Sequence, residues 1–177
     1  MSNTDTKKIA DSAVFKGAVE ISAILKDGSV VSLWKDHNLL TNGFIQSLMQ
    51  FLSGNPGTMT GTGNRTVQTG TGRWPTYMKV GTSTITPTRL DTAILSPIPF
   101  PGNESADFFM AITSFSFSTN NDAITFYAVI PGGDEDFSYN TTPLSEVGLF
   151  TESDVLIARQ VYPTISKSFI FQLQYAW

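Results

Sequence analysis

The sequence predicts a mainly β protein: a β-sandwich or jelly-roll-like domain of about seven or eight strands with one short α-helix. Short apolar or alternating segments recur between clusters of turn residues, which is typical of β-rich domains. Only one segment, at about 42–52, has apolar residues at helical spacing. Aromatic residues make up 12% of the chain, enough to fill a sandwich interior, where such residues usually dominate.

A chain of 177 residues ordinarily forms one domain with a sizeable core. We expect residues 1–12 to be a polar N-terminal arm and residues 13–177 to be a single β-sandwich domain. Within that domain, residues 53–72 form a long loop rich in Gly, Thr and Asn. Loops of this length in compact domains are usually functional or disordered, and we expect this one to serve in assembly.

The N-terminal part of the domain predicts a β-hairpin. Val14–Leu25 and Val30–Trp34 have strand character. Between them, Asp27-Gly28 is a strong hairpin signal, because Gly tolerates a positive φ. Further strands are expected at about 74–80, 108–117 and 123–130, the last two paired as a second hairpin.

The helix at about 42–52 is expected to pack its apolar face on the β core. Its apolar residues include Leu40, Phe44 and Leu48. Thr41 or Asn42 would begin it, since a short side-chain oxygen there accepts a hydrogen bond from an amide of the first turn.

The last part of the chain predicts a β-meander of three short strands. The segments are Ser145–Phe150, Leu156–Pro163 and Ser168–Trp177, with two turns between them. In the last segment the apolar residues share one parity, while the opposite face is mostly polar. These residues are Phe169, Phe171, Leu173, Tyr175 and Trp177. We therefore expect this strand to belong to the core.

The charge of the chain argues against nucleic-acid or membrane partners. The formal net charge is −4, and of the basic residues only Lys7 and Lys8 are adjacent. Binding to phosphate backbones or anionic lipids needs a clustered basic surface. Charged residues are only 15% of the chain, against about 25% in typical soluble domains. This low charge suits a protein whose surface is covered by neighbours, although it also fits an ordinary β-rich domain.

Other classes are excluded by missing residue types. There is no cysteine, which removes disulfides, zinc–thiolate sites and thiol nucleophiles. The first residues lack the apolar region of a signal peptide, and no apolar run is long enough to cross a membrane. We expect a soluble protein made without export.

The sequence assigns no catalytic, cofactor-binding or metal-binding residue, and we expect no enzymatic activity. The lone His37 cannot build the usual transition-metal site. Asp134-Glu135-Asp136 lacks the ligand spacing of an EF-hand, and whether this loop binds an ion stays open. The glycines of residues 53–72 are not followed by the Gly-Lys-Ser or Gly-Lys-Thr of a P-loop. No pattern pairs any two of four carboxylates considered for glycoside hydrolysis, which are Asp107, Asp122, Glu146 and Glu152.

Several short motifs together resemble the structural proteins of tailed bacteriophage particles. They follow one order between about Val30 and Trp177: Asn38–Gly43, Met78–Thr82, Pro87–Ala93, Ser145–Phe150, Leu156–Arg159, Tyr162-Pro163, Ile165–Lys167 and a strand ending in Trp. Glu-Val-Gly-Leu-Phe followed by Leu-Ile-Ala-Arg is similar to a segment of tail-collar fibre and baseplate-associated proteins.

The resemblance implies a non-enzymatic building block in the virion, made in the host bacterial cytoplasm. It would assemble in symmetric copies with other phage structural proteins, as a tail, baseplate or fibre-attachment component. A capsid decoration or head-fibre protein is the alternative. No long shaft or receptor-binding tip is present, so the resemblance does not extend to binding a host receptor.

A carbohydrate-binding module is a third hypothesis, from a different class. Such a site would need exposed aromatic side chains, and the candidates are Trp34, Trp74 and Tyr139. We expect Trp34 and Trp74 to cover the edge of the core instead.

Overall fold

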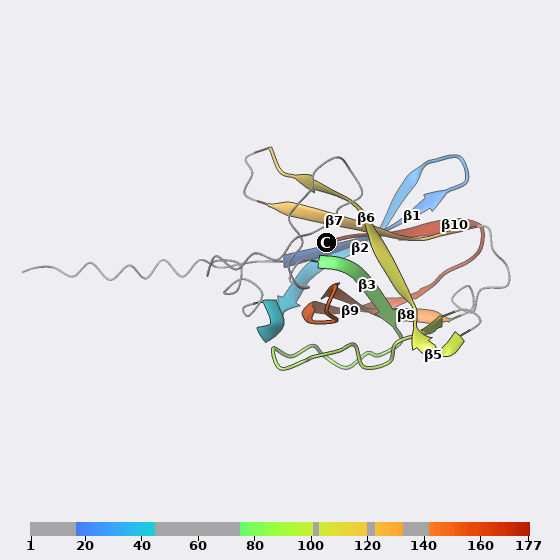
Figure 1. Ribbon diagram of the computed structural model, residues 1–177. Helices are drawn as coiled ribbons and strands as arrows, with labels where there is room; N and C mark the ends of the chain where they lie inside the picture. Colours follow the sequence, from blue (N-terminus) through green and yellow to red (C-terminus); the bar gives the residue numbers. More distant parts are fainter. Residues whose placement is uncertain (1–16, 45–74, 101–102, 120–122, 133–141) are drawn as a thin grey trace, which may run out of the picture.

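The computed structural model describes residues 17–44, 75–100, 103–119, 123–132 and 142–177, and these form a mainly β protein, as predicted (Figure 1). Eight strands pair antiparallel in a closed ring with the order β1-β10-β7-β6-β3-β8-β9-β2. The strands of the ring are β1 (Gly17–Leu25), β2 (Val30–Leu40), β3 (Pro75–Gly81), β6 (Phe109–Phe117), β7 (Ile124–Ile130), β8 (Pro143–Thr151), β9 (Leu156–Ser166) and β10 (Phe171–Ala176). A separate two-stranded ribbon consists of β4 (Pro99–Phe100) and β5 (Asn103–Asp107).

Three predicted features lie outside the described residues, wholly or in part. The arm at 1–12 and the loop at 53–72 are not among them. Of the helix at 42–52, residues 42–44 are described and are helical.

The main sheet is a closed barrel, where two separate sheets of a sandwich were expected. Closure depends on two strands that change partners along their length. β2 pairs with β1 up to Asn38 and then with β9 through Leu39 and Leu40. β6 pairs with β3 at its start and with β7 from Ile112 onward, where the register shifts. Strands that turn a corner at a bulge join what would otherwise be two sheets.

The predicted C-terminal meander is only half right. β8 and β9 form an antiparallel hairpin, as expected. β10, however, pairs with β1 on one side and β7 on the other, so that Leu173 lies opposite both Ala23 and Ile130. The last strand therefore lies beside the first, and an interaction across most of the chain replaces the predicted local pairing.

The alternation predicted for the last strand is confirmed within β10. Leu173, Tyr175 and Trp177 are buried, and Phe171 packs against them half-buried. Phe169 is 39% exposed, because it lies in the turn before the strand begins.

The seam between β2 and β9 contains only two residue pairs. Thr41 strengthens it: the backbone N–H donates to the Ile157 carbonyl at 2.9 Å, and the hydroxyl donates to the carbonyls of Leu156 and Ile157. Thr41 directly precedes the helical residues 42–44, where the sequence predicts a cap, and its hydroxyl is buried against β9.

One core fills the barrel, and a second, smaller cluster lies outside it. Tyr162 and Tyr175 meet in the core, with hydroxyl oxygens 3.0 Å apart. The outer cluster consists of Ile94, Phe150 and Leu156, with Tyr77 packed against it. After Pro143, every residue of β8 is buried, on both faces of the strand. The outer face of β8 is therefore covered by another part of the chain.

Leu173→Ala is expected to lower the free energy of unfolding by about 2–5 kcal/mol, because a fully buried leucine would leave a cavity. Deleting Ser168–Trp177 removes pairing to both β1 and β7 and should give insoluble protein. Chemical denaturation measures the first effect and solubility on expression the second. Phe169→Ala, in the preceding turn, is the control and should change little. A soluble truncation that melts cooperatively would show that β10 is peripheral.

Candidate functional site: a strap held by a buried ion-pair network

The outer cover of β8 and β9 is the segment of residues 82–98, which we call the strap. It leaves the end of β3, runs along the outside of the barrel and returns, as the green segment in Figure 1 shows. Its two ends are joined where Thr82 N–H donates to Ser96 O at 2.9 Å, and Ile98 N–H donates to Val80 O at 3.1 Å. At its far end, Asn42 N–H donates to Arg89 O at 3.0 Å.

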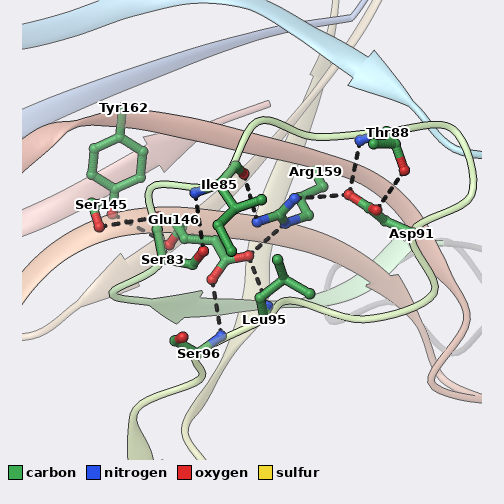
Figure 2. A network of polar contacts seen from close by, with 10 residues as sticks. All are labelled: Ser83, Ile85, Thr88, Asp91, Leu95, Ser96, Ser145, Glu146, Arg159 and Tyr162. Carbon is green, nitrogen blue, oxygen red and sulfur yellow. Dashed lines mark hydrogen bonds and ion pairs between the residues drawn. The ribbon is translucent and has the colours of Figure 1, made fainter.

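Arg159 of β9 is the centre of the contacts under the strap (Figure 2). Its side chain is 0% exposed. Nε donates to Glu146 Oε1 at 2.5 Å, Nη1 to Asp91 Oδ2 at 2.8 Å, and Nη2 to the Ile85 carbonyl at 3.0 Å. The planar guanidinium thus fixes one residue of β8 and two points of the strap in a single geometry.

Glu146 of β8 joins the barrel to the returning half of the strap. It is fully buried, and its carboxylate accepts hydrogen bonds from Leu95 N–H at 2.9 Å and Ser96 N–H at 3.3 Å. The close approach requires glycine at position 81. A Cβ there would lie 2.4 Å from Ser96 O and 2.8 Å from Glu146 Oε2.

Asp91 closes the network at the far end of the strap. Thr88 donates to its carboxylate from both the backbone N–H, at 2.9 Å, and the hydroxyl, at 2.6 Å. Burial alone would raise the pKa of Asp91, but the hydrogen bonds from Thr88 and the charge of Arg159 together hold that pKa below its ordinary value. Asp91 is therefore held as a carboxylate.

A second polar cluster lies on the outside of β3, next to the strap. Tyr77 Oη donates to Asp154 Oδ1 at 2.5 Å, and Lys79 Nζ lies 3.0 Å from Asp154 Oδ1 and 3.1 Å from Asp107 Oδ2. Lys79 Nζ also lies 5.0 Å from the ring centroid of Phe150. These contacts tie β3 to β5 and to the turn between β8 and β9.

The ionisation of this cluster follows from its geometry. Burial, reinforced by the neighbouring carboxylates, raises the pKa of Tyr77. Burial would raise the pKa of Asp154, but the hydrogen bonds from Tyr77 and Lys79 outweigh it and lower that pKa. Asp154 also has a φ of 61°, a strained value for a residue other than glycine, so these bonds hold the turn in place as well.

The carboxylates considered from the sequence do not meet as a catalytic pair. Glu146 is bound to Arg159, Asp107 is bound to Lys79, and Glu152 is exposed in the turn after β8. Asp122 and Asp134–Asp136 lie outside the described residues. Among the residues that are described, no three His, Asp or Glu side chains converge to hold a metal ion.

The other residues considered from the sequence are His37 and the three aromatic candidates for a sugar site. His37 is exposed on β2, opposite Ala18. Trp34 is half-buried and packs on Tyr162, with ring centroids 5.7 Å apart, so it covers the core edge as predicted. Trp74 and Tyr139 lie outside the described part of the chain.

The sequence did not reveal Arg159 and Asp91 as partners of Glu146. One signal was present: Glu146 and Arg159 each stand inside an otherwise apolar strand segment. A charge in such a position must be exposed or paired, since burying a lone charge is very unfavourable. The spacing Pro87-Thr88-x-x-Asp91 is a second signal, because Ser or Thr followed three residues later by an acidic residue is typical of a local capping interaction.

The chain matches no protein-family model, no curated protein and no solved structure. Within the described ranges, no helix has the length and apolar character needed to span a membrane.

Arg159→Met is expected to lower the free energy of unfolding by about 3–5 kcal/mol, because it leaves Glu146 as an unpaired buried charge. Adding Glu146→Gln should recover part of the loss, since it removes the buried charge and the amide oxygen can still accept the shorter of the two backbone hydrogen bonds, from Leu95 N–H. Denaturant titration measures both. Lys35→Met, which removes an exposed ion pair with Glu20, is the control and should have a small effect. Equal losses of stability in Arg159→Met and Lys35→Met would contradict a buried network.

Acid is expected to destabilise the protein through Asp91 and Asp154. Both carboxyls have a pKa below the ordinary value of 3.8 in the folded state. Their contribution is therefore complete above that value and is lost as the pH falls through the lower folded pKa. Denaturation from neutral pH to about pH 2 measures this loss. The double variant Asp91→Asn with Asp154→Asn should lose less of its free energy of unfolding as the pH falls. An unchanged loss would assign the acid effect to other groups.

Proposed function

We propose that this chain is a non-enzymatic structural subunit of a tailed bacteriophage particle. In this proposal it is a tail, baseplate or fibre-attachment component of the virion, assembled in symmetric copies with other phage structural proteins. The supporting observation is that four of the motifs that resemble phage structural proteins meet in the contacts around the strap.

Each of these four motifs contributes a residue with a defined part in the contacts. Met78–Thr82 supplies Gly81, which makes room for Glu146 and the strap. The other three motifs, Pro87–Ala93, Ser145–Phe150 and Leu156–Arg159, supply the three charged groups of the network, which are Asp91, Glu146 and Arg159. Asp91 and Arg159, which are 68 positions apart, thus act together. This convergence gives the motif order a structural reason, which supports the resemblance.

The use of these charged groups favours a structural role over a catalytic one. All three donor nitrogens of Arg159, and both carboxylate oxygens of Glu146, are engaged in fixing the strap. A catalytic group must instead be free to reach a substrate. The network serves to hold a surface segment in a set position, as a subunit contact requires.

The exposed surface also suits a protein that is covered by neighbours. Large apolar side chains remain exposed on several elements of the described chain, including the β1–β2 hairpin, the strap and β6. They are Leu25, Val30, Val31, Leu33, Ile85, Leu90, Leu95, Phe100, Phe109, Phe115, Phe117, Phe169 and Ile170. Together with the low content of charged residues, this favours burial in an assembly.

Immunogold electron microscopy of intact particles, with an antibody to the purified protein, tests the proposal. Label at the end of the tail is expected. Label over the head would instead support a capsid decoration or head-fibre protein, and binding of glycans by the isolated protein would support a carbohydrate-binding module. Peptide mass spectrometry of purified particles is the complement, because it also detects a protein whose epitopes are covered. Absence of the chain from particles by both methods would overturn the proposal.

A further inference from the structure

The strap holds large apolar side chains in solvent. Leu90 is 79% exposed, Ile85 is 64% exposed and Leu95 is 49% exposed. Single exposed apolar residues are common on protein surfaces, but three on one short segment are a concentration that needs a reason.

The backbone at each of these residues is fixed from below by the buried network. The Ile85 carbonyl accepts from Arg159, and the Leu95 N–H donates to Glu146. Leu90 stands between Arg89, whose carbonyl accepts from Asn42, and Asp91, which pairs with Arg159. A surface whose backbone is already ordered loses less conformational entropy when a partner binds. The strap therefore presents its apolar side chains in a preorganised arrangement.

Two exposed charges of opposite sign lie at the far end of the strap. Arg89 is exposed, and so is Glu152 in the turn between β8 and β9. Asn42 bonds to Arg89 there, and the adjacent Gly43 lies against Val155 and Leu156, which places the strap end and the turn side by side. In the described part of the chain, neither Arg89 nor Glu152 takes part in an ion pair.

We infer that the strap is the contact surface for a second copy of this chain, paired across a two-fold axis. A two-fold contact joins the same surface of both copies, so a surface that carries an apolar centre and one charge of each sign can complement itself. Arg89 of each copy would face Glu152 of the other, giving two symmetric ion pairs around the contact of the strap leucines and Ile85. This inference rests on the proposed function for its setting, but it concerns the isolated protein.

Charge reversal gives a direct test by analytical ultracentrifugation of the full chain over a wide concentration range. The wild type should associate to dimers. Arg89→Glu alone and Glu152→Arg alone should each weaken association, because each places like charges opposite one another. The double variant, Arg89→Glu with Glu152→Arg, should restore association, because the pairs are re-formed with exchanged signs.

Leu90→Asp tests the apolar centre and should raise the dissociation constant by about tenfold or more, as expected for a central contact residue. Val30→Asp is the matched control: Val30 is 60% exposed on the β1–β2 hairpin, away from the strap, and its substitution should leave association unchanged. Thermal melting of each variant checks that the fold is kept, since Leu90, Arg89 and Glu152 are all exposed.

A wild type that stays monomeric throughout would overturn the inference. So would association that Leu90→Asp does not weaken, or weakened association that the double charge reversal does not restore. None of these results bears on whether the chain is found in phage particles, so failure of the contact and failure of the proposed function can be told apart.

Discussion

The buried pair of Arg159 and Glu146 is the interaction on which the outer half of this structure depends. It lies between the barrel wall and the strap, with both side chains fully buried. Removing two charges from water is so unfavourable that apolar residues in their place are often as stable or more stable. The pair is therefore better explained by the position in which it holds the strap than by a gain in the stability of the fold. The N–H groups of a guanidinium point in fixed directions. Here they donate to one residue of β8 and to two separate residues of the strap.

The pair and the strap that it holds also constrain residues that have no charge. Gly81 must lack a side chain because Glu146 and the returning strap pass directly over it. Gly148 must lack one because Ile94 of the strap packs on β8, with its Cγ2 only 2.7 Å from where a Cβ would be. Thr88 orients Asp91 toward Arg159 with two hydrogen bonds. The network and the strap above it thus account for glycine at two positions and for the contacts of Thr88.

Local features of the fold could be predicted from the sequence, and distant ones could not. The Asp27-Gly28 hairpin and the β6–β7 hairpin follow from neighbouring residues, and both form. The position of β10 between β1 and β7 was missed, because alternation in Leu173 and Tyr175 shows that one face is buried without showing which strands lie beside it. Closure of the barrel was missed for a similar reason: a strand that turns a corner has the same alternation as one that does not.

The candidate site was harder still to predict, since it depends on side chains brought together by that missed topology. Glu146 and Arg159 are 13 residues apart on a hairpin, within reach of sequence reasoning once their apolar surroundings are noticed. Asp91, by contrast, belongs to an irregular segment whose path over the barrel no local pattern specifies. Its Thr88-x-x-Asp91 spacing predicts a local turn, and only the fold shows that the turn also receives the guanidinium.

The way the barrel closes also bears on how a second copy of the chain could meet it. Among the described residues, the edge of β2 before Leu39 faces no strand, and an open edge can recruit a strand from another molecule. Here that edge is protected: Leu33 has no partner in β1 and forms a bulge, and charged Lys35 and Asp36 follow it. β9, on the other side of the seam, carries Pro163, which has no N–H to donate. Pairing by strand addition is thus disfavoured at both edges. This favours the proposed contact between copies through side chains on an outer surface, and the strap offers such a surface on a backbone held by the buried charge network.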